Sequence, residues 1–159
     1  MASANLKTER KVLRSHRGRF HEHREAEPTS YAAESMFTAW REVTAPFSRT
    51  GLPADPMEFR AWRITLPKGK TVDLTDSNQR SRYKIATADL EADVATARCK
   101  EVALEIRRST EHYIGILYRS VRDKPKGLCI AIFLENLPPG VKVTSVDQEK
   151  FLRKIRKKG

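Results

Sequence analysis

The pattern of apolar and polar positions predicts alternating helices and strands from residue 30 onward. A helix is predicted over residues 35–45, where one face gathers Met36, Phe37, Trp40 and Val43. Ser35 precedes it and can cap it, because a serine hydroxyl accepts a bond from an orphan backbone N–H. We expect Pro46 to end this helix. Residues 46–57 contain three prolines and one glycine and are expected to form a loop.

In the middle of the chain, the pattern of apolar and polar residues predicts a strand, a second, shorter strand and the most regular helix of the whole sequence. Residues 58–66 read as a strand in which Trp62, Ile64 and Leu66 alternate with polar residues. Residues 72–74 follow as a short strand. The helix is expected over residues 93–109, where apolar residues recur at spacings of four and three: Ala95, Cys99, Val102 and Ile106.

Three strands and a final helix are predicted in the last third. The strands cover residues 113–118, 128–134 and 141–146, and the second is almost wholly apolar, which is typical of a central strand covered on both faces. Residues 149–158 predict a basic amphipathic helix with Phe151, Leu152 and Ile155 facing inward. The fold class that accommodates these elements is α+β: a single domain with a mixed β-sheet core and two main helices.

Composition narrows the class of protein. A chain of 159 residues corresponds to about one domain and can bury a core without disulfides or a metal. Cys99 and Cys129 lie far apart with no Cys-x-x-Cys pair, so two buried free thiols are expected. No apolar run reaches the roughly 18 residues of a membrane span, and no secretory signal is recognisable, so a cytoplasmic protein is expected.

Positive charge collects at both ends of the chain. The net charge is +11, and basic residues crowd residues 7–24 and 150–158. We therefore divide the chain into a basic mobile segment (1–15), a central domain (16–148) and a basic tail (149–159). Such ends attract nucleic acid through counterion release, but they also serve as solubilising surface or as contacts for an acidic protein partner.

Common catalytic motifs are missing from the sequence. It contains no Gly-x-Gly-x-x-Gly, P-loop, Gly-x-Ser-x-Gly or His-Glu-x-x-His motif. His16, His21 and His23 cluster among basic residues, without the carboxylate or cysteine spacing of a metal site. We therefore expect solvated histidines and no metal.

An arginine, a tyrosine and a glutamate occur in that order near the start, in Gly18-Arg19-Phe20, Tyr31-Ala-Ala-Glu-Ser35 and Ala39-Trp-Arg-Glu42. A cation, an aromatic wall and a carboxylate suit cleavage of a charged glycosidic bond. These pieces, together with Thr71–Asp76, Ala88–Leu90, Gly115–Ser120 and the apolar strand ending at Phe133, resemble the RES domain family. The order and approximate spacing agree from about residue 17 to about residue 146.

The resemblance implies a fold similar to ADP-ribosyltransferases and an NAD-consuming toxin of a toxin–antitoxin pair. NAD is then the substrate, cleaved by hydrolysis or phosphorolysis or used for ADP-ribosyl transfer. The implied partner is an antitoxin with a helix-turn-helix domain. The resemblance also implies roles for four residues: Glu42 at the nicotinamide ribose, Tyr31 on the nicotinamide ring and Arg19 at the pyrophosphate, with Ser120 either bonding a phosphate or the ribose or orienting the arginine.

The chain also departs from the family pattern. The family carries another arginine on an earlier strand, and residues 1–17 lack a strand pattern. Arg14 is too close to Arg19 to replace it. Ala97 stands where the family has a polar residue at the start of the long helix, and Lys100 stands where it commonly has a glutamine. Activity impaired by the missing arginine is one consequence to expect. The alternative is a non-enzymatic basic module that binds nucleic acid or an acidic protein partner on the same fold.

Overall fold

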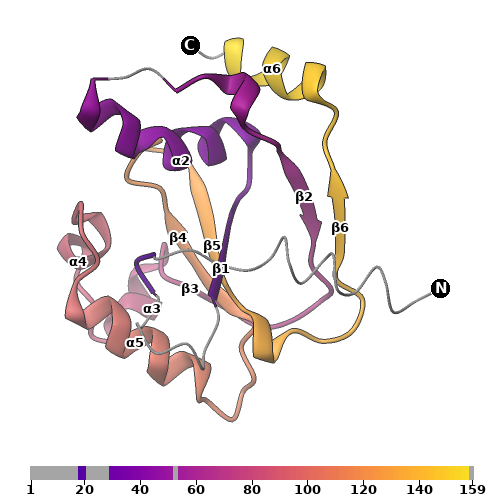
Figure 1. Cartoon of the computed structure of the whole chain (residues 1–159). Coiled ribbons are helices and arrows are strands. Elements are labelled where there is room, and N and C mark those ends of the chain that lie inside the picture. Colours follow the sequence, from indigo (N-terminus) through magenta and orange to yellow (C-terminus); the bar gives the residue numbers. More distant parts are fainter. Residues whose placement is uncertain (1–17, 21–28, 52–53, 158–159) are drawn as a thin grey trace.

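The computed structural model describes residues 18–20, 29–51 and 54–157, with side chains omitted for 46–50. Figure 1 shows the elements in chain order. The predicted segment 1–15 and the histidines at 16, 21 and 23 lie outside the described residues. Among those described, no helix is long and apolar enough to cross a membrane.

A four-stranded mixed sheet forms the centre of the fold. Its order is β1 (Thr29–Ala33), β5 (Leu128–Phe133), β4 (Gly115–Arg119) and β3 (Thr71–Asp73). Only the β3–β4 pair is parallel. The apolar run at 128–134 is indeed an interior strand, because β5 pairs with β1 on one side and β4 on the other. The predicted mixed-sheet α+β class is confirmed.

The main core lies between this sheet and the helices of the middle segment. These are α3 (Ser77–Arg82), α4 (Thr87–Glu91) and α5 (Ala97–Arg107). Helix α5 buries the face that its periodicity predicts, through Cys99, Val102 and Ile106. From the sheet, the core receives Val72, Ile116, Tyr118, Cys129, Ala131 and Phe133. Both cysteines are buried and free, as expected.

A second, smaller sheet stands beside the first. It consists of β2 (Trp62–Thr65) and β6 (Lys142–Ser145) in antiparallel register. The predicted strand 58–66 is shorter than expected, since β2 covers four residues and a 3-10 turn (η1, Pro56–Glu58) lies before it. A second 3-10 turn (η2, Leu134–Asn136) follows β5. Alternation in β2 does not produce a buried face: Trp62 remains 46% exposed.

Helix α2 (Met36–Thr50) begins as predicted and ends later than predicted. The Thr38 amide donates to Ser35 Oγ at 3.0 Å, which confirms the cap. The expectation that Pro46 ends the helix was wrong. A proline within a helix removes a single N–H donor. The helix stops instead at Gly51, whose φ of 71° is the left-handed conformation that glycine adopts at helix ends.

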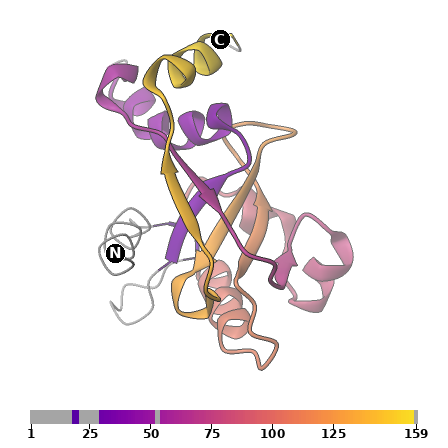
Figure 2. The same cartoon turned by 90° about the vertical axis from the view of Figure 1, so that its right-hand side faces the viewer.

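Helix α6 (Gln148–Arg156) packs on α2. Phe151 and Ile155 are buried, as the amphipathic pattern predicts, and Leu152 is half-buried. The Phe151 ring meets Trp40 of α2 at a centroid distance of 5.9 Å. Figures 1 and 2 show α2 and α6 at one end of the main sheet and α3, α4 and α5 towards the other.

Candidate functional site

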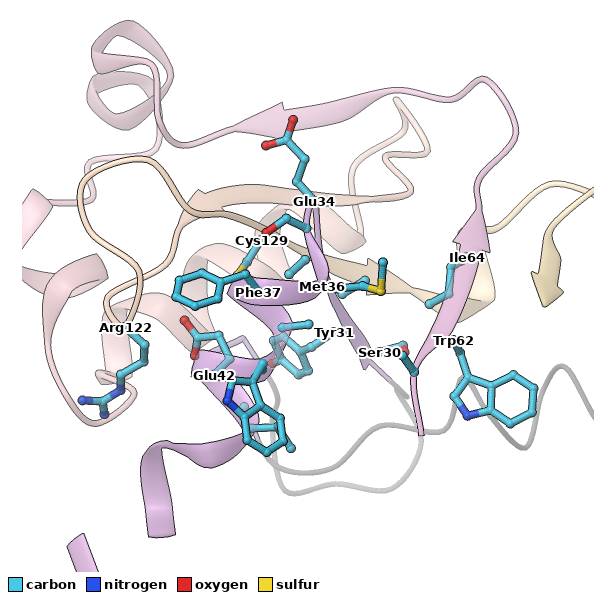
Figure 3. A pocket seen from close by; sticks show the side chains of 18 of the residues that line it. Ser30, Tyr31, Glu34, Met36, Phe37, Glu42, Trp62, Ile64, Arg122 and Cys129 are labelled. Carbon is cyan, nitrogen blue, oxygen red and sulfur yellow. The ribbon is translucent and has the colours of Figure 1, made fainter. Parts of the chain in front are cut away.

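A pocket of about 1340 Å³ opens beside β1 and the first turns of α2. Its walls come from β1, α2, β2, the α4–α5 connection and the ends of β4 and β5. Tyr31, Glu42 and Cys129 lie together in the close-up, whereas Trp62 lies off to one side, beyond β2 (Figure 3). Three of the four predicted site residues, Arg19, Tyr31 and Glu42, line this pocket.

Glu42 is held by the fourth predicted residue. Ser120 follows β4 and is only 2% exposed, and its hydroxyl donates to Glu42 Oε1 at 2.5 Å. Ser120 is not among the lining residues, so it stands behind the carboxylate. The sequence predicted a serine near phosphate or ribose; the contact observed is with Glu42. Glu34, the other carboxylate near the motif, is exposed and points away from Glu42 (Figure 3).

Tyr31 lies on β1 with its hydroxyl fixed by the backbone. Tyr31 Oη accepts a hydrogen bond from the Phe20 amide at 2.9 Å. Burial raises the pKa of the Tyr31 phenol well above its ordinary value, so the hydroxyl keeps its proton at neutral pH. Gly18 passes beneath the ring: a Cβ there would lie 2.2 Å from Tyr31 Cζ. Only glycine lets the chain approach the tyrosine this closely.

Arg19 reaches the pocket, but its guanidinium is already engaged. Arg19 Nη1 donates to the Asp89 carbonyl at 2.9 Å, and Nη2 donates to the Ala92 carbonyl at 2.5 Å. Both acceptors belong to the C-terminal end of α4, where carbonyls lack helical partners and attract cations. A guanidinium has five N–H donors, so capping α4 leaves donors for a second acceptor.

Cys129 and Tyr118 complete the wall beside Glu42. Burial raises the pKa of the Cys129 thiol from 9.0 to about 12, and the charge of Glu42 acts in the same direction. Burial likewise raises the pKa of Tyr118 well above its ordinary value. A thiol with so high a pKa carries almost no thiolate at neutral pH. Covalent chemistry by Cys129 is therefore disfavoured, and Glu42 is the anionic group of this wall.

The pocket as a whole suits an anionic ligand. Basic lining residues outnumber acidic ones two to one: Arg19, Arg60, Arg63, Lys100, Arg122 and Lys154 against Glu34, Glu42 and Asp93. One pair is internally neutralised, because Arg122 Nη1 lies 3.0 Å from Asp93 Oδ1. Within the described part of the chain, no group of three or more His, Cys, Asp or Glu side chains could hold a metal ion.

Several residues of this site escaped the sequence analysis. Thr38 and Asp123 bond to each other at 2.6 Å beside Glu42, across 85 residues of sequence. Tyr118 and Cys129 come from neighbouring strands paired in register. The one available signal was the i, i+4 spacing of Thr38 and Glu42, which places both on one face of a helix.

Comparison with known proteins identifies the class of domain. The sequence model of the RES domain family matches residues 5–154. Among solved structures, the M. tuberculosis MbcT-MbcA toxin-antitoxin complex contains a similar chain, with a TM-score of 0.64 and 18% sequence identity. The similarity covers 87% of this chain and 76% of that one, and it shows a shared fold. A search among curated proteins found no match.

Proposed function

The chain belongs to the RES domain family, and from this premise we propose that it cleaves NAD and is the cytoplasmic toxin of a toxin–antitoxin pair. The observation that carries the proposal is the Glu42 carboxylate in the pocket wall, hydrogen-bonded by buried Ser120 and flanked by Tyr31. Cleavage of a glycosidic bond that builds positive charge on the ribose needs such a fixed anion.

The residues present fit NAD as a substrate. The volume of about 1340 Å³ exceeds the roughly 300–1,000 Å³ of ordinary ligand pockets, so an extended dinucleotide can enter. The excess of basic lining residues favours the pyrophosphate. The remaining donors of Arg19 reach that group from the edge of α4, so Arg19 supports binding rather than bond cleavage.

In the reaction, Glu42 accepts a hydrogen bond from the nicotinamide ribose and stabilises the cation that forms as the C–N bond breaks. The bonding electrons leave with nicotinamide, which departs neutral and needs no general acid. Tyr31 stacks on the nicotinamide ring, a contact worth about 0.5–1.5 kcal/mol between aromatic groups. An acceptor then attacks the ribose carbon. Attack by water gives ADP-ribose and a proton. Attack by phosphate gives ADP-ribose phosphorylated at the carbon that carried nicotinamide, and attack by a protein side chain gives an ADP-ribosylated protein.

Nicotinamide release from NAD, with and without phosphate, tests this proposal. We expect Glu42→Gln to lower the rate by about 100-fold or more, because it removes the charge and keeps the shape. The matched control is Glu149→Gln, an exposed acid of α6 that does not line the pocket. If wild type releases no more nicotinamide than Glu42→Gln, NAD degradation is excluded. Labelled NAD and a cell lysate then test transfer to protein.

The proposed partner is an antitoxin with a helix-turn-helix domain. Its support is the similar fold seen in a toxin-antitoxin complex. Expression of this chain alone should arrest growth, and co-expression with an adjacent helix-turn-helix gene should relieve the arrest. Arrest that persists in Glu42→Gln would separate toxicity from NAD cleavage.

A second function, nucleic-acid binding, is favoured by the exposed side of α6. We define the α6 basic face as five exposed side chains: Lys150, Arg153, Lys154, Arg156 and Lys157. Phosphate contacts by such residues make binding fall with salt, with a log–log slope of about −0.9 per phosphate on duplex DNA. Lys150→Gln/Lys157→Gln should flatten the slope by nearly two units, whereas Lys68→Gln/Lys126→Gln should not. Absence of binding at low salt removes this candidate.

A further inference from the structure

Three hydrogen bonds tie one face of α2 to the turn that follows β4. Glu42 accepts from Ser120, and Thr38 donates to Asp123 Oδ2 at 2.6 Å. Arg41 Nε donates to the Arg122 carbonyl at 3.1 Å. Thr38 and Glu42 are four residues apart, so they stand one above the other on the face that meets this turn.

The Ser120 hydroxyl has its full set of partners. Its oxygen accepts from the Arg122 amide at 3.1 Å and from the Asp123 amide at 3.0 Å. A serine oxygen has two acceptor sites and one proton to donate. Because two backbone N–H groups occupy the acceptor sites, the single proton of Ser120 points to Glu42 Oε1. The carboxylate position thus depends on where the turn holds Ser120.

Asp123 connects the two ends of this arrangement. Its amide donates to Ser120, and its carboxylate accepts from Thr38. Thr38 Oγ1 in turn lies 2.8 Å from Ser35 Oγ. Ser35 is the donor of that bond, because the hydroxyl proton of Thr38 is donated to Asp123. Glu42, Ser120, Asp123 and Thr38 therefore form a closed ring through one turn of α2. Thr38 and Ser120 are each 2% exposed, so water does not replace these bonds readily.

We propose that Thr38 and Asp123 are positioning residues, which fix the Glu42 carboxylate at the reacting ribose without touching the substrate. The proposal rests on the proposed function for its kinetic consequence and on the ring for its geometry. Displacement of a reacting group by about 1 Å can cost about 100-fold in rate, so loss of the ring should reduce turnover while leaving substrate affinity largely intact.

Four variants test the ring by steady-state NAD cleavage. Thr38→Val and Asp123→Ala should each lower kcat about tenfold and change KM less than about threefold. Thr38→Ser keeps the hydroxyl and should restore kcat. The double variant Thr38→Val/Asp123→Ala should be no slower than the slower single variant, because each substitution removes the same Thr38–Asp123 hydrogen bond. Wild-type kcat in Thr38→Val, or an equal loss in Thr38→Ser, would overturn the proposal.

A spectroscopic measurement separates this proposal from the proposed function. If wild type fails to cleave NAD, the proposed function fails and the kinetic arm has no signal. The ring is then judged by the 13C resonance of the Glu42 carboxyl carbon, assigned with Glu42→Gln. Asp123→Ala, at a half-buried turn position, should shift this resonance, and Thr38→Ser should not. An unchanged resonance in Asp123→Ala and Thr38→Val would overturn the ring in either case.

Discussion

The pocket has two walls of opposite character. The inner wall, formed by Tyr31, Glu42, Tyr118 and Cys129, stands on the four-stranded sheet and α2, where Tyr31 and Glu42 make defined hydrogen bonds. The outer wall, formed by Trp62, Arg63 and Lys154, stands on the two-stranded sheet and α6, and all three side chains are exposed.

The two walls therefore differ in how firmly their side chains are held. The bond cleavage that we propose needs groups held to about half an ångström, and the side chains of the inner wall are the ones that buried neighbours and hydrogen bonds hold in place. The outer wall presents long cations and an indole that are exposed to solvent, so it can adapt to ligands of different shape. We therefore expect mutations to be costly on the inner side and mild on the outer side.

The largest effect is expected from the sheet beneath the inner wall. Phe133 is fully buried in β5, and the Arg107 guanidinium lies 4.5 Å from its ring centroid. Phe133→Ala should reduce the free energy of unfolding by about 3–5 kcal/mol, because it leaves a cavity and removes this contact. Urea denaturation measures the change. A loss below about 1 kcal/mol would show that the two walls do not differ as described.

A smaller loss is expected when the hydroxyl of the inner-wall tyrosine is removed. Tyr31→Phe leaves the Phe20 amide without its acceptor, which should cost about 1–3 kcal/mol. Hydrogen exchange localises the effect, since the Phe20 amide should exchange faster than in wild type. Unchanged protection of that amide would contradict the assignment of the bond.

Alkaline pH should weaken the inner wall selectively. Burial raises the pKa of the Cys129 thiol to about 12 in the folded chain, from a reference value of 9.0. Between these values the unfolded chain binds fewer protons than the folded one, so stability is complete below about pH 9 and falls as the pH rises towards 12. Denaturation midpoints from pH 8 to 11 should fall less steeply in Cys129→Ala. Parallel curves for the two proteins would rule out this contribution.

The smallest effect is expected on the outer wall. Trp62→Ala removes an indole that is 46% exposed and should cost less than about 1 kcal/mol. The same denaturation series provides the measurement, with Phe133→Ala as the reference. A loss as large as that of Phe133→Ala would mean that the small sheet supports the fold as strongly as the large one.

Local rules were sufficient for most elements of the fold. Strand β5 and helices α5 and α6 followed from apolar runs and periodicity, and Ser35 capped α2 as its side chain predicts. Pro46 misled the prediction: α2 continues past it to Thr50, although a proline removes one helical hydrogen bond and crowds the carbonyl of the preceding turn. The separation of β2 and β6 into their own sheet depends on pairing over about eighty residues, which alternation cannot reveal.

The candidate site was predictable only as a set of residues. The sequence motifs named Arg19, Tyr31, Glu42 and Ser120, and three of these line one pocket while the fourth bonds Glu42. Their contacts were not predictable: that Arg19 caps α4 depends on carbonyls some seventy residues later. Asp123 escaped notice because its role arises from two contacts, with Thr38 and Ser120, that only the folded turn creates.

The two cysteines also make it possible to measure how often different parts of this molecule open. The chain has no other thiols; Cys99 lies on the buried face of α5 in the main core, and Cys129 lies at the pocket wall. Since burial keeps both thiols away from solvent, a bulky thiol reagent can modify each one only when the residues around it separate. The rate at which Cys129 is modified then reports how often the pocket opens, and the rate for Cys99 reports how often the core opens. An antitoxin or ligand that covers only the pocket should slow the modification of Cys129 alone. One that stabilises the whole chain should slow both reactions.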